Sequence, residues 1–205
     1  DVYLPRGDGP RPVTLLVHGG GFVIGHRRMK PMRLVATHLV SAGHVVGVFD
    51  YRLLGRGAGL SAAVDDVVAA GAWLMSQAAR FRVDPERFGA VGLSAGGALM
   101  LLAAPRMAGL SRMVSVFGLY DFADLRGVSR LFTRLSAGAQ PGGSSPLHYP
   151  VDAPLTLLHG TEDTLVPFRQ AEALYARRAA AGLATRLLPF EGARHAFLNE
   201  VHSAD

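Results

Sequence analysis

The sequence predicts a three-layer α/β fold in which a mostly parallel sheet is covered by helices on both faces. Short apolar runs rich in β-branched residues alternate along the chain with longer, alanine-rich stretches of helical character. Nearly continuous apolar runs are typical of strands that are buried on both faces of a parallel sheet. With 205 residues, 49% hydrophobic and 18% charged, the chain is long and apolar enough to bury one core. We therefore expect a single domain over residues 1–205.

The expected elements follow these patterns in chain order. The apolar runs predict strands at 13–17, 45–49, 88–92, 113–117, 155–158 and 185–188. Helical patterns lie between them, at about 31–42, 60–80, 95–104, 168–182 and 196–203. In the second of these helices, apolar residues recur at helical spacing, and Asp65 and Asp66 lie near its beginning, where the helix dipole favours negative charge.

Two stretches depart from the alternation. Residues 118–150 are rich in Asp, Gly, Ser and Pro, which predicts an irregular excursion of the chain, with a short helix at about 127–136 and the character of a reduced lid. Residues 55–59 read Gly-Arg-Gly-Ala-Gly, but Leu60 stands where a dinucleotide-binding fingerprint has its third glycine. A nucleotide cofactor site of the Rossmann type is therefore not expected.

Composition excludes several classes of protein. There are no cysteines, so disulfides and thiolate metal sites are ruled out. The net charge of +5 is spread along the chain, so we expect no nucleic-acid partner. We expect no membrane span, because no apolar run is long enough. The start of the chain lacks the basic and apolar regions of a signal peptide, which favours a cytoplasmic location, although the missing Met leaves a removed upstream segment open.

The candidate nucleophile is Ser94. It lies in Gly92-Leu93-Ser94-Ala95-Gly96, between an apolar strand and a helical run, which is the context that a nucleophile elbow requires. Glycines at positions 92 and 96 allow a turn sharp enough to force the hydroxyl outward. The backbone N–H of Ala95, at the beginning of the helix, is then free to stabilise negative charge beside Ser94.

A glycine run follows the strand 13–17. In His18-Gly19-Gly20-Gly21, the absence of side chains lets backbone N–H groups point into a cavity and hold an oxyanion. We expect the N–H groups of Gly20 and Gly21 to be the donors. The alternative, a phosphate cradle, lacks the Gly-Lys-Ser/Thr end of a P-loop.

The candidate acid and base follow Ser94 in the chain. Asp163 comes directly after the strand 155–158, where open α/β sheets place functional groups, with Glu162 as its neighbouring competitor. Asp121 and Asp124 are further alternatives after an earlier strand. His195 follows the last expected strand, at the beginning of the helix 196–203, and the order Ser, Asp, His suits a catalytic triad. The remaining histidines are scattered, so no metal site is expected; His18 and His159 are expected to shape loops through hydrogen bonds to the backbone.

Several of these motifs together resemble the α/β-hydrolase family, and within it the HGGG-bearing esterases related to hormone-sensitive lipase and bacterial acetyl esterases. The segments that carry the resemblance, in the order of the family, are His18–Phe22, Asp50–Leu53, Gly92–Gly97, Ser145–Leu147, His159–Asp163 and His195–Phe197. The resemblance implies a Ser94, His195 and Asp163 triad, with Gly20, Gly21 and Ala95 as oxyanion donors. It also implies that Asp50, Tyr51 and Arg52 brace the oxyanion loop.

The activity that the resemblance implies is hydrolysis of carboxylic esters, without a cofactor. Because residues 118–150 are short for a lid, we expect the site to be open on one side, which favours short-acyl or small soluble esters over long-chain lipids. Phe22 and Tyr120 are the expected substrate contacts, and Phe117 and Phe122 are further pocket candidates. An arylformamidase or small-peptide hydrolase using the same triad, and an inactive hydrolase fold that binds a ligand, remain alternatives. The family usually has further strands and often a helical cap before the strand 13–17, so we expect either a minimal hydrolase or one whose upstream part is missing.

Overall fold

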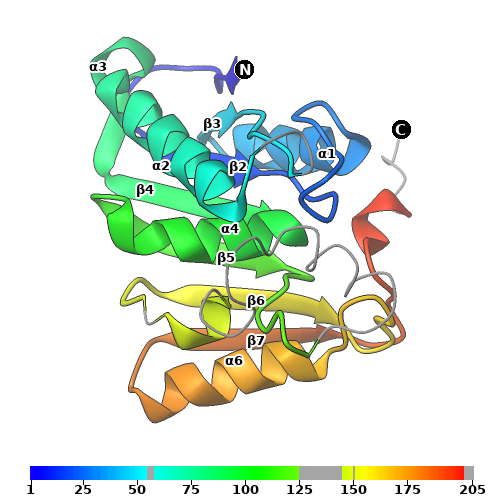
Figure 1. The fold of residues 1–205 in the computed structure, drawn as a ribbon. Helices are drawn as coiled ribbons and strands as arrows, with labels where there is room; N and C mark the ends of the chain where they lie inside the picture. The colour runs from blue at the N-terminus through cyan, green and yellow to red at the C-terminus, as the bar shows by residue number, and fades with distance from the viewer. Residues whose placement is uncertain (55–57, 125–144, 150, 201–205) are drawn as a thin grey trace.

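The computed structural model describes residues 1–54, 58–124, 145–149 and 151–200, which form one seven-stranded sheet (Figure 1). The strand order is β1-β3-β2-β4-β5-β6-β7. Only the edge strand β1 is antiparallel to its neighbour; the other pairs are parallel. The strand bounds are β1 Val2–Tyr3, β2 Arg11–Val17, β3 Val45–Val48, β4 Val83–Leu93, β5 Leu110–Val116, β6 Leu155–Gly160 and β7 Thr185–Phe190.

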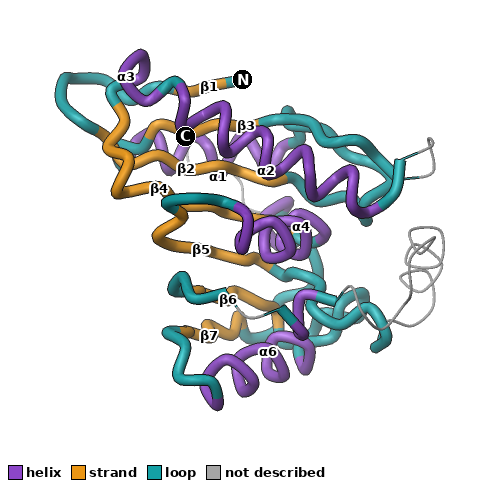
Figure 2. The backbone as a smooth tube through the Cα atoms, turned by 60° about the vertical axis from the view of Figure 1, so that its left-hand side comes forward, coloured by secondary structure: helices purple, strands orange, loops and turns teal. Residues whose placement is uncertain are grey.

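Helices cover both faces of the sheet, as Figures 1 and 2 show. One face carries α2 (Leu60–Ser76), α4 (Ala95–Ala103) and α6 (Arg169–Ala180), and the other carries α1 (Lys30–Ser41). The short helix α3 (Ala78–Phe81) follows α2, and 3-10 turns lie at η1 Ala104–Arg106, η2 Pro146–His148 and η3 Phe197–Asn199. This arrangement confirms the three-layer α/β prediction.

The core is divided between the two faces because each parallel strand is buried on both sides. One apolar cluster joins the sheet to α2, α4 and α6 and includes the buried side chains of Leu74, Leu99 and Leu174. The second joins the opposite face to α1 through Met32 and Ala36, which pack against Leu16 and Val46 of the sheet. Both faces of the sheet are therefore held by apolar burial, the main stabilising contribution to such a fold.

Some element boundaries differ from the predicted ones. Strand β4 begins at Val83, before the predicted 88–92, because its first half is an exposed polar stretch that carries no apolar run. The predicted helix 60–80 is divided after Ser76 into α2 and α3, and Arg82, with φ +52°, ends the second part. The predicted short helix at 127–136 lies outside the described residues.

The predicted helix 196–203 is wrong in its described part. Ala196 has a left-handed backbone, with φ +59°, and only the 3-10 turn η3 follows it. A left-handed residue cannot begin an α-helix, and it turns the chain back toward α1 instead. His195 therefore lies in a loop between β7 and η3.

Parallel pairing brings the carboxyl ends of β2, β4, β5, β6 and β7 to the same edge of the sheet. The glycine run, the serine turn and the loops that carry Asp163 and His195 all follow strands at this edge. Residues distant in the chain therefore converge there because of topology.

Candidate active site

Ser94 lies at a sharp turn between β4 and α4. Its backbone angles, φ +52° and ψ −119°, are rarely adopted by a residue with a side chain and store strain at the turn. A Cβ on Gly92 would overlap the backbone of Gly96, and a Cβ on Gly96 would overlap the carbonyl group of Val17. The two glycines are thus required for strand and helix to approach this closely, as the motif predicts.

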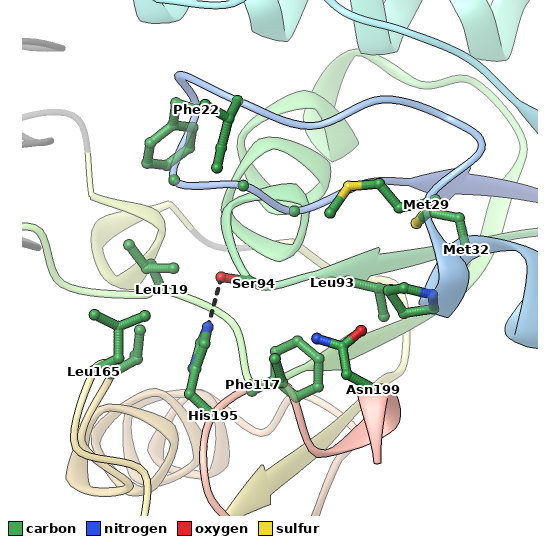
Figure 3. A pocket seen from close by; sticks show the side chains of 17 residues that line it. Phe22, Met29, Met32, Leu93, Ser94, Phe117, Leu119, Leu165, His195 and Asn199 are labelled. Atoms are coloured by element: carbon green, nitrogen blue, oxygen red, sulfur yellow. Dashed lines mark hydrogen bonds between the residues drawn. The ribbon is translucent and has the colours of Figure 1, made fainter. Parts of the chain in front are cut away.

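The structure brings Ser94, His195 and Asp163 into one chain of hydrogen bonds. Ser94 Oγ lies 3.0 Å from His195 Nε2, and His195 Nδ1 lies 2.6 Å from Asp163 Oδ2. A carboxylate can only accept, so Nδ1–H donates to Asp163 and Nε2 is left as the acceptor of the serine proton. Figure 3 shows the imidazole pointing at the serine hydroxyl from the loop after β7. This arrangement can remove a proton from the serine oxygen during attack.

The Asp163 carboxylate is buried and receives several donors. Oδ1 accepts the backbone N–H groups of Leu165 (3.0 Å) and Val166 (2.8 Å). Oδ2 accepts His195 and also lies 3.3 Å from Nε2 of His159, whose ring is fully buried. Burial by itself raises the pKa of Asp163, but the hydrogen bonds from His159 and His195 outweigh it and lower this pKa to about 2. Asp163 therefore stays ionised beside the imidazole.

The competing acids lie elsewhere. Glu162 is exposed, and its neighbour is the carboxylate that reaches His195. Asp121 Oδ1 accepts the N–H of Ala123 two residues further along the chain. Asp124 forms an ion pair with Arg169 at the beginning of α6. Among the candidates that the sequence offered, only Asp163 contacts the imidazole.

The glycine run lies beside the serine. Gly20 and Gly21 line the same cavity as Ser94, and Ala95 is the first residue of α4. Within the part of the chain that the structure describes, the N–H groups of these three residues have no hydrogen-bond partner. They remain available for an oxyanion that forms on a substrate held at Ser94.

Two residues after β3 support this loop. The Tyr51 hydroxyl donates to the carbonyl oxygen of His18 (3.2 Å), and the two rings stack with centroids 4.1 Å apart. Asp50 accepts the backbone N–H of Arg27 (2.6 Å) and pairs with its guanidinium group. Burial lowers the pKa of His18, so this imidazole stays neutral, with Nδ1 2.7 Å from the Gly19 carbonyl oxygen.

The expectation that Arg52 braces the loop is wrong. Its guanidinium group forms an ion pair with Asp66 of α2 (2.9 Å) and also donates to the carbonyl oxygen of Ala62 (3.2 Å). The side chain of Arg52 therefore holds the beginning of α2 and not the glycine run.

The cavity at Ser94 has a volume of about 280 Å³ and is mainly apolar. Its walls come from the glycine run, α1, the ends of β4 and β5, the loop after β6 and the loop after β7 (Figure 3). The lining residues are Gly19, Gly20, Gly21, Phe22, Ile24, Met29, Pro31, Met32, Leu93, Ser94, Phe117, Leu119, Leu165, Val166, His195, Ala196 and Asn199.

The expected substrate contacts are placed differently from one another. Phe22 lines the cavity, but Tyr120 does not, so its expected contact with substrate is wrong. The Tyr120 side chain is fully buried, and its hydroxyl donates to Ser115 Oγ (2.8 Å) within the core. Its ring therefore packs in the apolar core, whereas its neighbour Leu119 lines the cavity. Phe122, a further candidate, contacts Phe22 edge to face at 5.9 Å, outside the lining.

Two site features were missed from the sequence. His159 was expected only to shape its loop, and its Nε2 does lie 2.8 Å from the Val166 carbonyl oxygen, but the same atom also faces Asp163. Asn199 falls in the predicted helix 196–203, but it lies in a 3-10 turn and its amide enters the cavity. No local pattern marks either residue, because both contacts depend on how separate loops pack.

Across residues 1–54, 58–124, 145–149 and 151–200, no group of three or more His, Cys, Asp or Glu side chains is arranged to hold a metal ion. In the same ranges, every helix is too short or too polar to cross a lipid bilayer.

Comparison with known proteins identifies the family and the fold of the chain. The model of the BD-FAE family matches residues 1–127. The chain is 26% identical over 230 residues to a probable isoprenylcysteine α-carbonyl methylesterase, ICME, of Oryza sativa subsp. japonica, covering 95% of this chain and 54% of that protein. It is 29% identical over 190 residues to a probable carboxylic ester hydrolase, LipM, of Mycobacterium tuberculosis, covering 80% and 44%. The chain thus spans about half the length of these relatives.

A solved structure extends the likeness to three dimensions. The butyrate-bound structure of the esterase Est2 from the planctomycete Thermogutta terrifontis superposes with a TM-score of 0.80 at 27% identity, covering 96% of this chain and 79% of that one. The family match covers more than half of the sequence. The chain belongs to the BD-FAE family and has the α/β-hydrolase fold.

Proposed function

We propose that this protein hydrolyses carboxylic esters, with Ser94 as nucleophile, His195 as general base and acid, and Asp163 as the residue that orients and stabilises the imidazole. The observation that carries the proposal is the continuous chain from Ser94 Oγ through His195 to Asp163, with distances of 3.0 and 2.6 Å. The named activities of ICME, LipM and Est2 support an ester as the substrate.

The reaction proceeds in two halves. Ser94 Oγ attacks the ester carbonyl carbon while its proton passes to His195 Nε2. The N–H groups of Gly20, Gly21 and Ala95 receive the oxyanion of the tetrahedral intermediate. Collapse of the intermediate breaks the bond to the alcohol oxygen, which takes the proton from Nε2, and the acyl group stays on Ser94. Water then gives a proton to Nε2 as its oxygen attacks the acyl carbon, and the acid leaves as Ser94 regains its proton.

The cavity supports a small substrate. Ligand pockets for larger organic molecules usually range from about 300 to 1,000 Å³. The cavity at Ser94, with about 280 Å³, lies just below this range, and its lining is mainly aliphatic, aromatic and thioether. Esters with short acyl chains and small, uncharged alcohols fit this space, and we propose them as the substrate class.

The test is covalent labelling combined with turnover. The purified protein should react with a fluorophosphonate probe at Ser94 and hydrolyse p-nitrophenyl acetate and butyrate. Ser94→Ala should abolish labelling and lower kcat by about 10⁶-fold. Ser41→Ala, at an exposed serine at the end of α1, is the matched control and should leave both unchanged.

Two outcomes would overturn the proposal. A folded protein that neither reacts with the probe nor turns over any ester would be a binding protein on a hydrolase fold. A protein that labels at Ser94 but cleaves formyl-aryl amides in strong preference to the matched esters would be an amidase using the same residues. Including one formyl-aryl amide in the substrate panel separates the second outcome from ester hydrolysis.

A further inference from the structure

The walls of the cavity at Ser94 contain one polar side chain that the proposed reaction does not use. Among the lining residues, the polar side chains are those of Ser94, His195 and Asn199. The first two belong to the proposed triad. Asn199 lies at the end of η3, in the segment that follows the catalytic loop. Asn199 is exposed, so its amide lies where a largely apolar cavity opens to solvent.

The amide faces one side of the nucleophile. In Figure 3, Asn199 points into the cavity on the side of Ser94 where Phe117, Met29 and Met32 lie. The opposite side is walled by Phe22, Leu119 and Leu165, all of them apolar. An ester held at Ser94 extends to both sides of it, with the acyl arm on one side and the alcohol arm on the other. Only one of these two arms can therefore contact the amide.

Contacts with α1, β7 and Phe117 hold the turn that carries Asn199 in place. Lys30 Nζ, at the beginning of α1, donates to the backbone carbonyl oxygen of Asn199 (2.9 Å). The Asn199 N–H donates to the Ala196 carbonyl oxygen (2.8 Å). Phe197, two residues earlier, stacks on Phe190 with centroids 4.8 Å apart and meets Phe117 edge to face at 5.2 Å. The backbone of this turn is therefore fixed against both α1 and the sheet.

The side-chain amide of Asn199 has no hydrogen-bond partner in the described part of the chain, so its donors and its acceptor are open to a ligand. A few polar groups placed in an apolar pocket commonly fix the orientation and identity of a ligand. A substrate arm that carries a hydrogen-bonding atom can form a hydrogen bond with this amide, whereas an all-hydrocarbon arm of the same shape makes only apolar contacts.

We propose that Asn199 is a specificity-determining residue that selects esters carrying an oxygen function, such as an ether, hydroxyl or second carbonyl oxygen, on the arm that lies toward Phe117 and Met29. This inference rests on the proposed ester hydrolysis at Ser94 and narrows its substrate class from small apolar esters to small oxygenated ones. Lys30 acts through Asn199 as a positioning residue.

The experiment uses pairs of esters that differ by replacement of one CH₂ with an ether oxygen. The acyl-arm pairs are p-nitrophenyl butyrate with methoxyacetate, and p-nitrophenyl pentanoate with 3-methoxypropanoate. The alcohol-arm pair is butyl acetate with 2-methoxyethyl acetate. For each pair the ratio of kcat/KM values is compared between wild type and variant, so that differences in intrinsic reactivity cancel.

Asn199→Leu, which keeps the side-chain volume and removes the amide, should lower the ether-to-methylene ratio about fivefold to tenfold in one arm. This change corresponds to the loss of one hydrogen bond of about 1 kcal/mol. Asn199→Asp should lower the ratio at least as much, because a carboxylate cannot donate to an ether oxygen. Glu200→Gln, at the next exposed side chain outside the cavity lining, is the matched control and should leave the ratio unchanged.

Lys30→Met should move the ratio part of the way toward that of Asn199→Leu, because the turn that carries Asn199 loses its hydrogen bond to α1. An equal ether-to-methylene ratio in wild type and Asn199→Leu, in both arms, would overturn the inference. That result is distinguishable from failure of the proposed function, because butyrate turnover and labelling of Ser94 would persist. A loss of labelling in wild type would instead overturn the proposed function itself.

Discussion

His159 Nε2 lies 3.3 Å from Asp163 Oδ2, the carboxylate oxygen that also accepts the hydrogen bond from His195. The same Nε2 lies 2.8 Å from the carbonyl oxygen of Val166, whose N–H donates back to Asp163. One buried imidazole therefore contacts both the first and the last residue of the loop from Asp163 to Val166. Since an ionised carboxylate and a carbonyl oxygen both only accept, Nε2 must carry the proton.

His159 should therefore act as a positioning residue for Asp163. His159→Leu leaves the buried Val166 carbonyl group without its donor and should cost about 1–3 kcal/mol of stability. It should also lower kcat per fluorophosphonate-labelled site about tenfold, because Asp163 loses one of its fixed contacts. His159→Gln, whose terminal amide can donate to the same oxygen atoms, should recover most of kcat. Full kcat per labelled site in the leucine variant would show that Asp163 is oriented without His159.

Asp163 should make the protein sensitive to acid. Its pKa in the folded protein is about 2, below the ordinary value of 3.8, so its contribution to stability is complete above about pH 5 and is lost as the pH falls through 2. The contribution is on the order of 2 kcal/mol. In urea unfolding between pH 5 and pH 2.5, Asp163→Asn should show a smaller loss of stability than wild type.

Glu162→Gln, at the exposed neighbouring carboxylate, is the matched control for this acid titration. It should follow the wild-type pH dependence and retain activity, whereas Asp163→Asn should also lower kcat by about 10⁴-fold, as in other triads that lose the acid. If both variants lost stability with pH as steeply as wild type, the buried carboxylate would not be the group responsible.

Tyr51 should support catalysis through the glycine run. Tyr51→Phe keeps the ring stacked on His18 but removes the hydroxyl that donates to the His18 carbonyl oxygen. We expect a loss of about 1 kcal/mol in stability and a several-fold fall in kcat with little change in KM, because the loop that carries Gly20 and Gly21 is held less firmly.

The adjacent Arg52 provides the control for Tyr51. Arg52→Gln breaks an exposed ion pair with Asp66, which solvent screens, and should therefore change stability little and leave kcat unaltered. Thermal unfolding and initial rates on p-nitrophenyl acetate measure both variants. A larger loss of kcat in the arginine variant than in the tyrosine variant would contradict this assignment of roles.

The size of the cavity predicts the dependence of rate on acyl length. In a p-nitrophenyl series, kcat/KM should be highest for acetate to butyrate and should fall by about tenfold or more at octanoate, because a longer chain exceeds a cavity of about 280 Å³ and has to extend into solvent. The measurement is kcat/KM below the solubility limit of each ester. A rise that continues to dodecanoate would contradict the small-substrate class.

The order of strands and helices, and the residue types at the site, followed from local patterns. Continuous apolar runs marked parallel strands, and glycines on both sides of Ser94 marked a turn that no larger residue permits. The positions of Ser94, Asp163 and His195 after three strands of one parallel sheet suffice to infer convergence, because parallel strands end at one edge. These inferences require only spacing and side-chain size.

Tertiary packing decided what local patterns could not. Tyr120 and Leu119 are adjacent, and only the packing of their loop sends the first into the core and the second into the cavity. The left-handed backbone of Ala196 replaced the predicted helix with a turn that carries Asn199 to Lys30, across most of the chain. Contacts of this kind join residues far apart in sequence, so their free energies depend on the assembled fold and leave no periodic signal in the sequence.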